Sequence, residues 1–163
     1  MAKDFSFDVV SEADLNEVLN AVNMSMKEVS GRFDFKGSIA NITLNELNLE
    51  LVADDEMRLK NLIQILEGKL VKRGIDLGFL DYQKMESSLG GNVKQTVVLK
   101  NGIETETAKE INKALRDSKI KVNPQIQGDK IRVSSPKKDA LQEAMQFLKG
   151  QNFGIVLQFN NFR

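Results

Sequence analysis

The sequence predicts an α+β fold made of two similar units, each an antiparallel sheet with two helices on one face. Three observations support this prediction. The order strand, helix, two hairpin strands, helix, strand occurs twice along the 163 residues. The strands alternate apolar and polar side chains, as expected when one sheet face is covered. The small, polar segment at residues 87–92 divides the repeats as a linker would. We therefore expect one domain in residues 1–90 and a second in residues 91–163.

In the first repeat, residues 5–9 alternate Phe and Val with polar residues, which predicts a strand. Ser11, with Asp14 three residues later, is typical of a helix start, and apolar residues follow at helical spacing until Gly31. The remaining elements are predicted as hairpin strands at residues 40–44 and 47–51, a second helix, and a strand at residues 80–86. This helix has acidic residues 54–56 at its start, an apolar stripe at residues 59–70, and residues 72–74 at its close.

The second repeat follows the same order. Ser135 is placed to cap the last helix, with Pro136 in its first position. The other elements are predicted as a strand at residues 95–99, a helix at residues 108–115, hairpin strands at residues 120–126 and 131–133, and a strand at residues 155–159. Two βαββαβ repeats predict a duplicated ferredoxin-like fold, in which one face of each sheet is left uncovered.

The composition excludes several classes of function. The chain has no Cys and no His, so disulfides, the common zinc and copper sites, and a Ser–His or Cys–His relay are excluded. We expect no cofactor and no metal. Neither a signal peptide nor an apolar run of about 20 residues is present, so we expect a cytoplasmic protein without a membrane partner.

The charge is distributed unevenly although the net charge is zero. Residues 1–93 carry 10 Lys and Arg and 16 Asp and Glu, whereas residues 94–163 carry 13 and 7. The second repeat is therefore basic enough to attract phosphates.

The first candidate site is the uncovered sheet face of the second repeat. If its apolar residues face the helices, the residues between them face outward. These are Lys119, Lys121, Asn123, Gln125 and Gln127 on one strand, and Lys130, Arg132 and Ser134 on its partner. Such a patch can bind several phosphates without reading a sequence. Each residue alone is more typical of a solvated sheet face, whereas the whole set favours a phosphate-binding patch.

The second candidate site is the start of the last helix, at Ser135, Lys137 and Lys138. Lysines near the positive end of a helix dipole cost about 0.3 to 1 kcal/mol each at low salt, and a bound anion reverses the sign of that effect. Lysines in salt also tolerate this cost, so the pattern is balanced between a phosphate site and an ordinary helix start.

The third candidate is the segment from Arg32 to Lys36. Phe33 and Phe35 share one side of an extended segment, and Arg32, Asp34 and Lys36 share the other. Paired rings beside cations can stack bases, but we expect both rings to pack into a core or against a neighbouring domain. Arg32 and Lys36 remain candidate ligands.

Three segments resemble the bacterial YajQ family: GRFDFKG at residues 31–37, IQGDKIRV at residues 126–133 and LQFNNFR at residues 157–163. The resemblance covers essentially the whole chain. It implies a duplication in which the first strands are exchanged, so that residues 4–10 complete the second sheet and residues 94–100 the first. It also implies a cytosolic protein that binds nucleotides or nucleic acid and has no established enzymatic activity.

These observations favour a non-enzymatic protein that binds a nucleotide or RNA. RNA-recognition modules use exposed aromatic residues on the two central strands, whereas here one of these strands carries Lys130 and Arg132, so we expect charge-dominated binding. No Walker or paired-glycine dinucleotide motif is present. The sequence does not separate a small nucleotide from a long RNA, and it leaves the oligomeric state open.

Two other classes of function stay open. The chain could be a regulatory adaptor with a protein partner, controlled by a small nucleotide such as a cyclic dinucleotide. An enzyme using the carboxylate pair Glu104 and Glu106 is the least favoured alternative, because acids at a helix start normally match the helix dipole.

Overall fold

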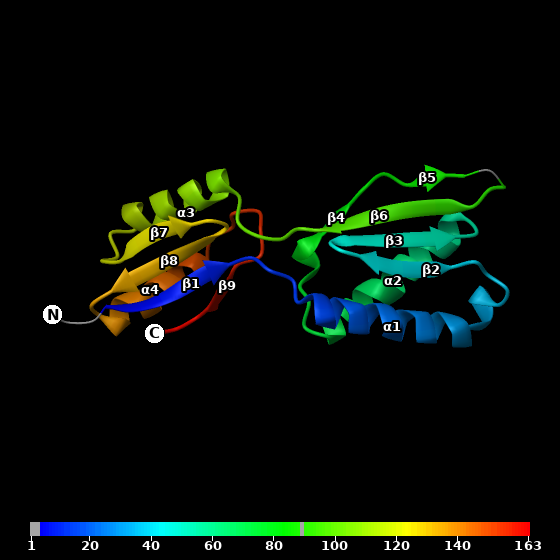
Figure 1. Cartoon of the computed structure of the whole chain (residues 1–163), viewed down its shortest axis with the longest axis horizontal. Coiled ribbons are helices and arrows are strands. Elements are labelled where there is room, and N and C mark those ends of the chain that lie inside the picture. Colours follow the sequence, from blue (N-terminus) through cyan, green and yellow to red (C-terminus); the bar gives the residue numbers. More distant parts are fainter. Residues whose placement is uncertain (1–3, 89) are drawn as a thin grey trace. The chain divides into compact units, whose positions relative to one another are not determined.

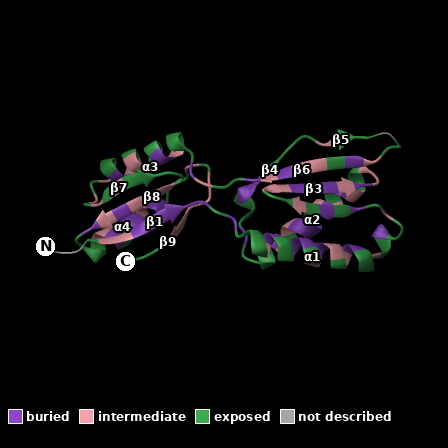
Figure 2. Ribbon diagram, viewed as in Figure 1, coloured by how far each residue is buried: buried purple, intermediate pink, exposed green. Residues whose placement is uncertain are grey.

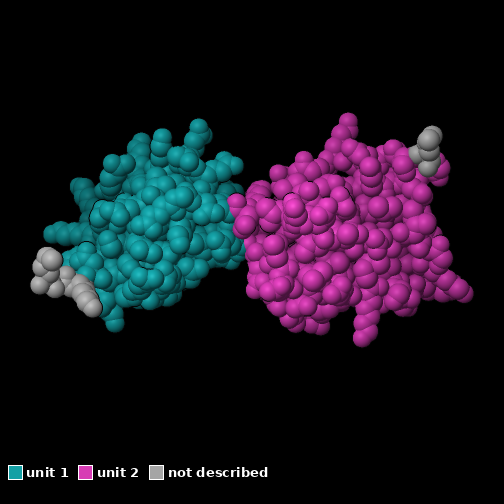
Figure 3. All heavy atoms as spheres, viewed as in Figure 1, with its two compact units in different colours: residues 1–12, 102–163 teal, residues 13–101 magenta. Residues whose placement is uncertain are grey.

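The computed structural model describes residues 4–88 and 90–163, which form an α+β protein with two antiparallel sheets (Figure 1). The chain divides into two compact units, coloured separately in Figure 3. Unit 1 consists of residues 1–12 and 102–163, and unit 2 consists of residues 13–101. Unit 1 is therefore built from two separate chain segments, whereas unit 2 is continuous.

In unit 2 the sheet has the strand order β2-β3-β6-β4, and β5 also pairs with β6. All of these pairs are antiparallel. The strands are β2 (Asn41–Asn45), β3 (Asn48–Ala53), β4 (Leu80–Tyr82), β5 (Glu86–Ser87) and β6 (Val93–Leu99), the helices are α1 (Leu15–Gly31) and α2 (Glu56–Lys72), and 3-10 turns lie at η1 (Phe33–Phe35) and η2 (Leu77–Phe79).

In unit 1 the sheet has the antiparallel order β7-β8-β1-β9. Its first strand in the chain, β1, lies between β8 and β9, although more than 100 residues separate β1 from both in sequence (Figure 1). The strands are β1 (Phe5–Val10), β7 (Asn123–Gln127), β8 (Lys130–Ser135) and β9 (Gln158–Asn160), and the helices are α3 (Thr105–Asp117) and α4 (Lys138–Lys149).

One sheet face in unit 1 packs on both helices, as the alternating sequence predicts. Phe7 and Val9 of β1 are fully buried with Ile131 and Val133 of β8, and α3 and α4 contribute residues such as Ile111 to the same core. Figure 2 shows this buried layer along the strands. Since these apolar residues face the helices, the residues between them lie on the opposite, open face.

The predicted starts of α1 and α4 were wrong by a few residues. The N-cap of α1 is Asp14, whose side chain accepts hydrogen bonds from the backbone N–H groups of Asn16 and Glu17, because the chain is not yet helical at Ser11. The N-cap of α4 is Lys137 rather than Ser135. Ser135 is still the last residue of β8 and pairs with Phe5, so Pro136 lies before the helix.

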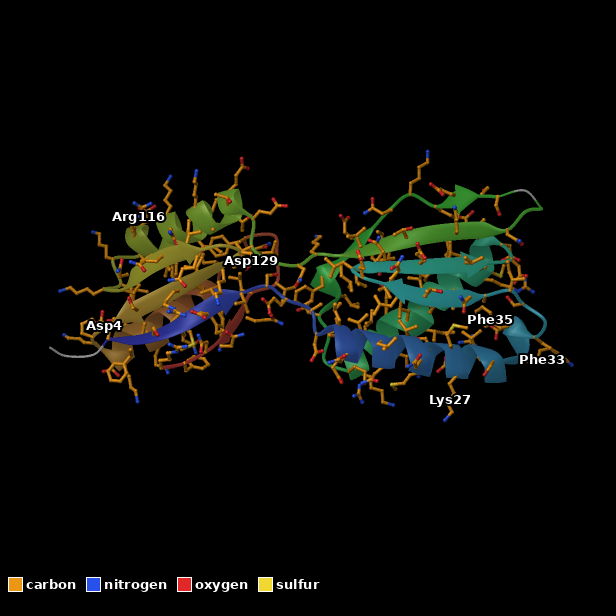
Figure 4. All side chains as sticks on the ribbon, viewed as in Figure 1. Asp4, Lys27, Phe33, Phe35, Arg116 and Asp129 are labelled. Atoms are coloured by element: carbon orange, nitrogen blue, oxygen red, sulfur yellow. The ribbon has the colours of Figure 1, made fainter. Side chains whose placement is uncertain are left out.

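Several strand and side-chain predictions also need correction. The predicted strand at residues 80–86 is two short strands, β4 and β5, and the last strand is limited to Gln158–Asn160. Residues 33–35 form a 3-10 turn instead of an extended segment. Phe35 is buried as predicted, but Phe33 is 88% exposed; both residues are labelled in Figure 4. A 3-10 turn places neighbours two apart on different sides, which explains the difference.

Candidate functional site

The open face of the unit 1 sheet carries a polar row that crosses all of its strands. Gln125 of β7 is paired with Arg132 of β8, Arg132 with Asp8 of β1, and Asp8 with Asn160 of β9. The next row pairs Gln127 with Lys130. Because directly paired residues share one side of an antiparallel sheet, the predicted outward orientation of Gln125, Gln127, Lys130 and Arg132 agrees with the register.

Asp8 holds the two cations of this face. Its carboxylate accepts a hydrogen bond from Nε of Arg132 at 3.1 Å, and Nζ of Lys130 lies 3.7 Å from the other oxygen. Nδ2 of Asn161 donates to the same carboxylate at 2.9 Å. The Asp8 side chain is only 2% exposed, whereas those of Lys130 and Arg132 are 39% and 31% exposed. Lys130 and Arg132 therefore present a net charge of +1 to a ligand rather than +2.

Burial and hydrogen bonding shift the pKa of Asp8 in opposite directions. Burial alone raises the pKa of a carboxyl group, but the hydrogen bonds from Asn161 and Arg132, with the positive charge of Arg132 and Lys130, outweigh it. The pKa of Asp8 is thus held below its ordinary value, and the side chain is ionised at neutral pH. The pairing with both cations is a fixed part of this sheet.

Lys119 and Lys121 lie before β7, in the turn that follows α3, and the prediction that they belong to the strand was wrong. Lys119 has the left-handed backbone angle φ of 63°, which is uncommon for a residue with a side chain. Its N–H donates to the carbonyl of Arg116, which closes the end of α3. The tight turn explains why the strand begins only at Asn123.

Ser135 ties this turn to the start of α4. Its hydroxyl donates to the carbonyl oxygen of Lys121 and accepts from the backbone N–H of Lys137, each at 3.1 Å. Ser135 is buried, and both hydrogen bonds use its hydroxyl within the protein. The exposed side chains that it brings to one end of the sheet are those of Lys121 and Lys137.

Lys138 begins α4 and turns toward an aromatic ring. Its Nζ lies 5.2 Å from the centroid of the Phe5 ring, within the range of a cation–π contact. Among the described residues no carboxylate oxygen lies within 4.0 Å of the side-chain nitrogens of Lys119, Lys121, Lys137 or Lys138. These lysines are therefore the uncompensated cations of the two predicted sites.

Arg32 and Lys36 belong to unit 2, so they are separate from the other predicted site residues. The guanidinium of Arg32 makes two 2.9 Å hydrogen bonds to the carboxylate of Asp34 and a 3.4 Å contact to Glu28. Lys69 also binds Glu28, at 2.9 Å. Arg32 and Lys36 line an open hollow of about 350 Å³ beside the exposed Phe33. Arg32 is largely occupied by acidic partners, whereas Lys36 is exposed.

The carboxylate pair considered for an enzyme is exposed. Glu104 is the N-cap of α3 but accepts no hydrogen bond there through its side chain, and Glu106 lies in the first turn.

In residues 4–88 and 90–163 no group of acidic side chains is arranged to hold a metal ion. None of the helices in this part of the chain combines the length and apolar character needed to cross a membrane.

The two compact units differ less in net charge than the two sequence repeats do. Unit 1 carries 12 Lys and Arg and 10 Asp and Glu, a net charge of +2, and unit 2 carries 11 and 13, a net charge of −2. The reason is that residues 1–12, with a net charge of −2, belong to unit 1, whereas residues 94–101, which contain Lys94 and Lys100, belong to unit 2. The compact units therefore differ less in charge than the sequence repeats, whose own charges are as counted above.

Sequence reasoning missed Asp8 and Phe162. Asp8 has the same alternation phase as Ser6, so the assignment of residues 4–10 to the second sheet, which the resemblance implies, was a signal for the open face. Its pairing with Arg132 is known only from the register. Phe162 follows β9 and is 62% exposed. An aromatic residue next to Arg163 was a signal for ligand contact that the sequence interpretation used only as part of a motif.

The sheets, each with helices on one face, define an α+β protein compatible with two βαββαβ units, with uncompensated lysines at one end of the unit 1 sheet. The chain belongs to the YajQ-like nucleotide-binding protein family, whose model matches residues 5–163. It is 56% identical over 165 residues to a nucleotide-binding protein of Carboxydothermus hydrogenoformans, and both chains are covered completely. It is also similar to nucleotide-binding proteins of Heliobacterium modesticaldum, at 52% identity over 163 residues with 100% of this chain and 99% of the relative covered, and of Desulfitobacterium hafniense, at 49% identity with complete coverage of both.

Proposed function

We propose that this protein binds nucleotides or RNA without catalysing a reaction, through unit 1. The phosphates contact Lys119, Lys121 and Lys137, and the start of α4. The observation that carries the proposal is that these exposed lysines have no carboxylate within 4.0 Å among the described residues, although the unit contains ten acidic side chains. The relatives are named as nucleotide-binding proteins, which supports the same ligand class.

The rest of the open face contributes less to affinity than its sequence suggested. Lys130 and Arg132 share the charge of Asp8, and Gln125 and Gln127 add amide groups without charge. Since phosphate contacts give affinity without reading bases, and Phe7 is in the core rather than on this face, the proposed binding is weakly selective for RNA sequence.

We also propose that the chain arose by duplication with exchange of the first strands, each repeat having its first strand in the sheet of the other. The pairing of β1 with β8 and of β6 with β3 supports this origin. The repeats then remain residues 1–90 and 91–163, while the compact units differ from them by the exchanged strands. The adaptor alternative, in which an acidic first repeat and a basic second repeat bind partners or each other, is less favoured, because the charge contrast between the compact units is small.

The test is equilibrium binding of a single-stranded RNA across a salt series. For the double variant Lys121→Ala with Lys137→Ala, we expect weaker binding and a salt slope smaller by roughly 1.4, since each phosphate contact on a single strand contributes about 0.7. The matched control, Lys84→Ala with Lys100→Ala, removes the same charge from exposed positions of unit 2. Equal effects of the two double variants would show that only net charge matters and would contradict the proposed site.

A further inference from the structure

Unit 1 contains an aromatic pocket between α4 and the chain that follows β9. The pocket has a volume of about 300 Å³ and is lined by Phe5, Phe7, Leu141, Met145, Phe162 and Arg163, among others. Ligand pockets in proteins have volumes of about 300 to 1,000 Å³. This volume, at the lower end, suits a single nucleoside better than a dinucleotide.

The floor and one wall of this pocket are aromatic. The fully buried ring of Phe7 lies 6.2 Å from the ring of Phe162, centroid to centroid. Phe162 is 62% exposed, so one side of its ring is open to a ligand. The backbone next to Phe162 is tied to β1, because Ser6 and Arg163 exchange backbone hydrogen bonds at 3.1 and 3.0 Å. An aromatic ring with an accessible face is a stacking platform for a base.

Cations lie at the rim of the same pocket. Lys138 lines it, with its ammonium group held over the Phe5 ring, and Arg163 lines it from the chain end beyond β9. Among the described residues neither side chain has a carboxylate oxygen within 4.0 Å. Lys138 is also the first residue of α4, where no side chain caps the helix, so first-turn N–H groups are free to meet an anion. Asp139, in the same turn, does not line the pocket.

We infer that this pocket is a mononucleotide site: the base stacks on Phe162 above the floor formed by Phe7, and the phosphate contacts Lys138 and Arg163. The inference rests on the proposed function and specifies its small-ligand form. It places the base on the helix side of β1, where Phe7 points, whereas the lysines proposed for RNA lie before the start of β7 and after the end of β8.

The test is calorimetric titration of the full chain with GMP, AMP and the corresponding nucleosides. For Phe162→Ala we expect mononucleotide affinity to fall about tenfold or more, as for the loss of a base–aromatic stack. The control Phe33→Ala removes a more exposed ring from unit 2 and should leave affinity unchanged. Lys138→Ala should weaken GMP binding but leave guanosine binding unchanged, and it removes a side chain that is exposed rather than buried in the core.

Wild-type affinity in a folded Phe162→Ala variant would overturn this inference, as would the absence of mononucleotide binding by the wild-type protein. If Phe162→Ala does not fold, by its circular dichroism melt, the Lys138→Ala comparison decides: equal loss of GMP and guanosine affinity, or no loss of either, contradicts the phosphate contact. RNA binding that depends on Lys121 and Lys137, with no mononucleotide binding, would overturn the inference alone. Loss of neither RNA nor mononucleotide affinity in the respective variants would overturn both.

Discussion

Asp8 in unit 1 and Glu28 in unit 2 each bind two cations, but they differ in burial. The Asp8 side chain is 2% exposed and that of Glu28 is 37% exposed. The cations themselves are similarly exposed, with the side chain of Arg132 at 31% and that of Arg32 at 40%. We therefore expect that the burial of the carboxylate decides whether its paired cation can bind a ligand instead. An exposed pair is weak and a ligand can displace it, whereas a buried one is part of the fold.

The second difference between the units, chain continuity, gives the largest expected effect. A fragment of residues 13–101 contains every strand of the unit 2 sheet and should fold by itself, because β6 lies within it. A fragment of residues 102–163 lacks β1, which lies between β8 and β9, and should not fold. Circular dichroism and thermal melting of the two fragments check this prediction.

Adding a peptide of residues 4–12 to the second fragment is the matching experiment. The peptide supplies β1 with its core residues Phe7 and Val9, so it should restore a cooperative melt. A folded fragment of residues 102–163 without the peptide would contradict the assignment of β1 to this unit.

The next largest effect is on the free energy of unfolding, when the charge of Asp8 or Glu28 is removed. Asp8→Asn should lower the free energy of unfolding by about 1 to 3 kcal/mol, because it weakens buried hydrogen bonds from Arg132 and Asn161 that involve a charge. Glu28→Gln, the corresponding change at an exposed pair, should leave the urea midpoint within error. Equal destabilisation by both changes would show that burial of the acid is not the deciding variable.

The comparison of wild type with Asp8→Asn also predicts how stability depends on pH. The pKa of Asp8 is lowered in the folded state, so its contribution is complete above the ordinary carboxyl pKa of about 3.9 and is lost as the pH falls below it. The stability difference between wild type and Asp8→Asn should therefore be constant from about pH 7 to pH 5 and shrink between about pH 4 and pH 3. Urea titrations at these values check it, and an undiminished difference at pH 3 would contradict the role of the carboxylate.

A smaller effect is expected at two glycines with left-handed backbone angles. Gly102 in unit 1 has φ of 84°, and a Cβ there would lie 3.0 Å from the side chain of Asp129. Gly74 in unit 2 has φ of 81°, with no atom within 4 Å of such a Cβ. Gly74→Ala should cost about 1 kcal/mol from the backbone alone, and Gly102→Ala should cost more. Thermal melts of the two variants check the order, and equal costs would show that the contact with Asp129 is relieved by rotation of that side chain.

The smallest effect is expected for Arg32. Because Asp34 binds its guanidinium through two hydrogen bonds, Arg32→Ala should change RNA affinity by no more than about twofold, the scale of an exposed ion pair. Filter binding beside Lys121→Ala checks this. A larger loss for Arg32→Ala than for Lys121→Ala would move the ligand to unit 2.

Local sequence patterns predicted most elements, because alternation and helical spacing reflect which face is covered. The pattern at residues 5–9 correctly placed Phe7 and Val9 in a core. It could not show which core, since the partners of β1 lie more than 100 residues away. Only the family resemblance indicated the second sheet.

The candidate site was predicted less well for the same reason. The open-face positions of Lys130 and Arg132 followed from their neighbours, but their neutralisation by Asp8 depends on strand pairing across the chain. The predicted start of α4 lay too early in the chain, because Ser135 is a residue type that often caps helices. In the structure the hydroxyl of Ser135 donates a hydrogen bond to the carbonyl oxygen of Lys121, and the helix begins at Lys138. Tertiary contacts decided both outcomes.

The most direct test of the central claim, that unit 1 binds the ligand, is an amide NMR titration of the whole protein with a short single-stranded RNA. We predict that the largest shift changes occur at residues 119–121 and 134–138, with small changes across residues 13–101. Changes confined to residues 28–36 and 61–72 would instead place the RNA on unit 2 and contradict the account.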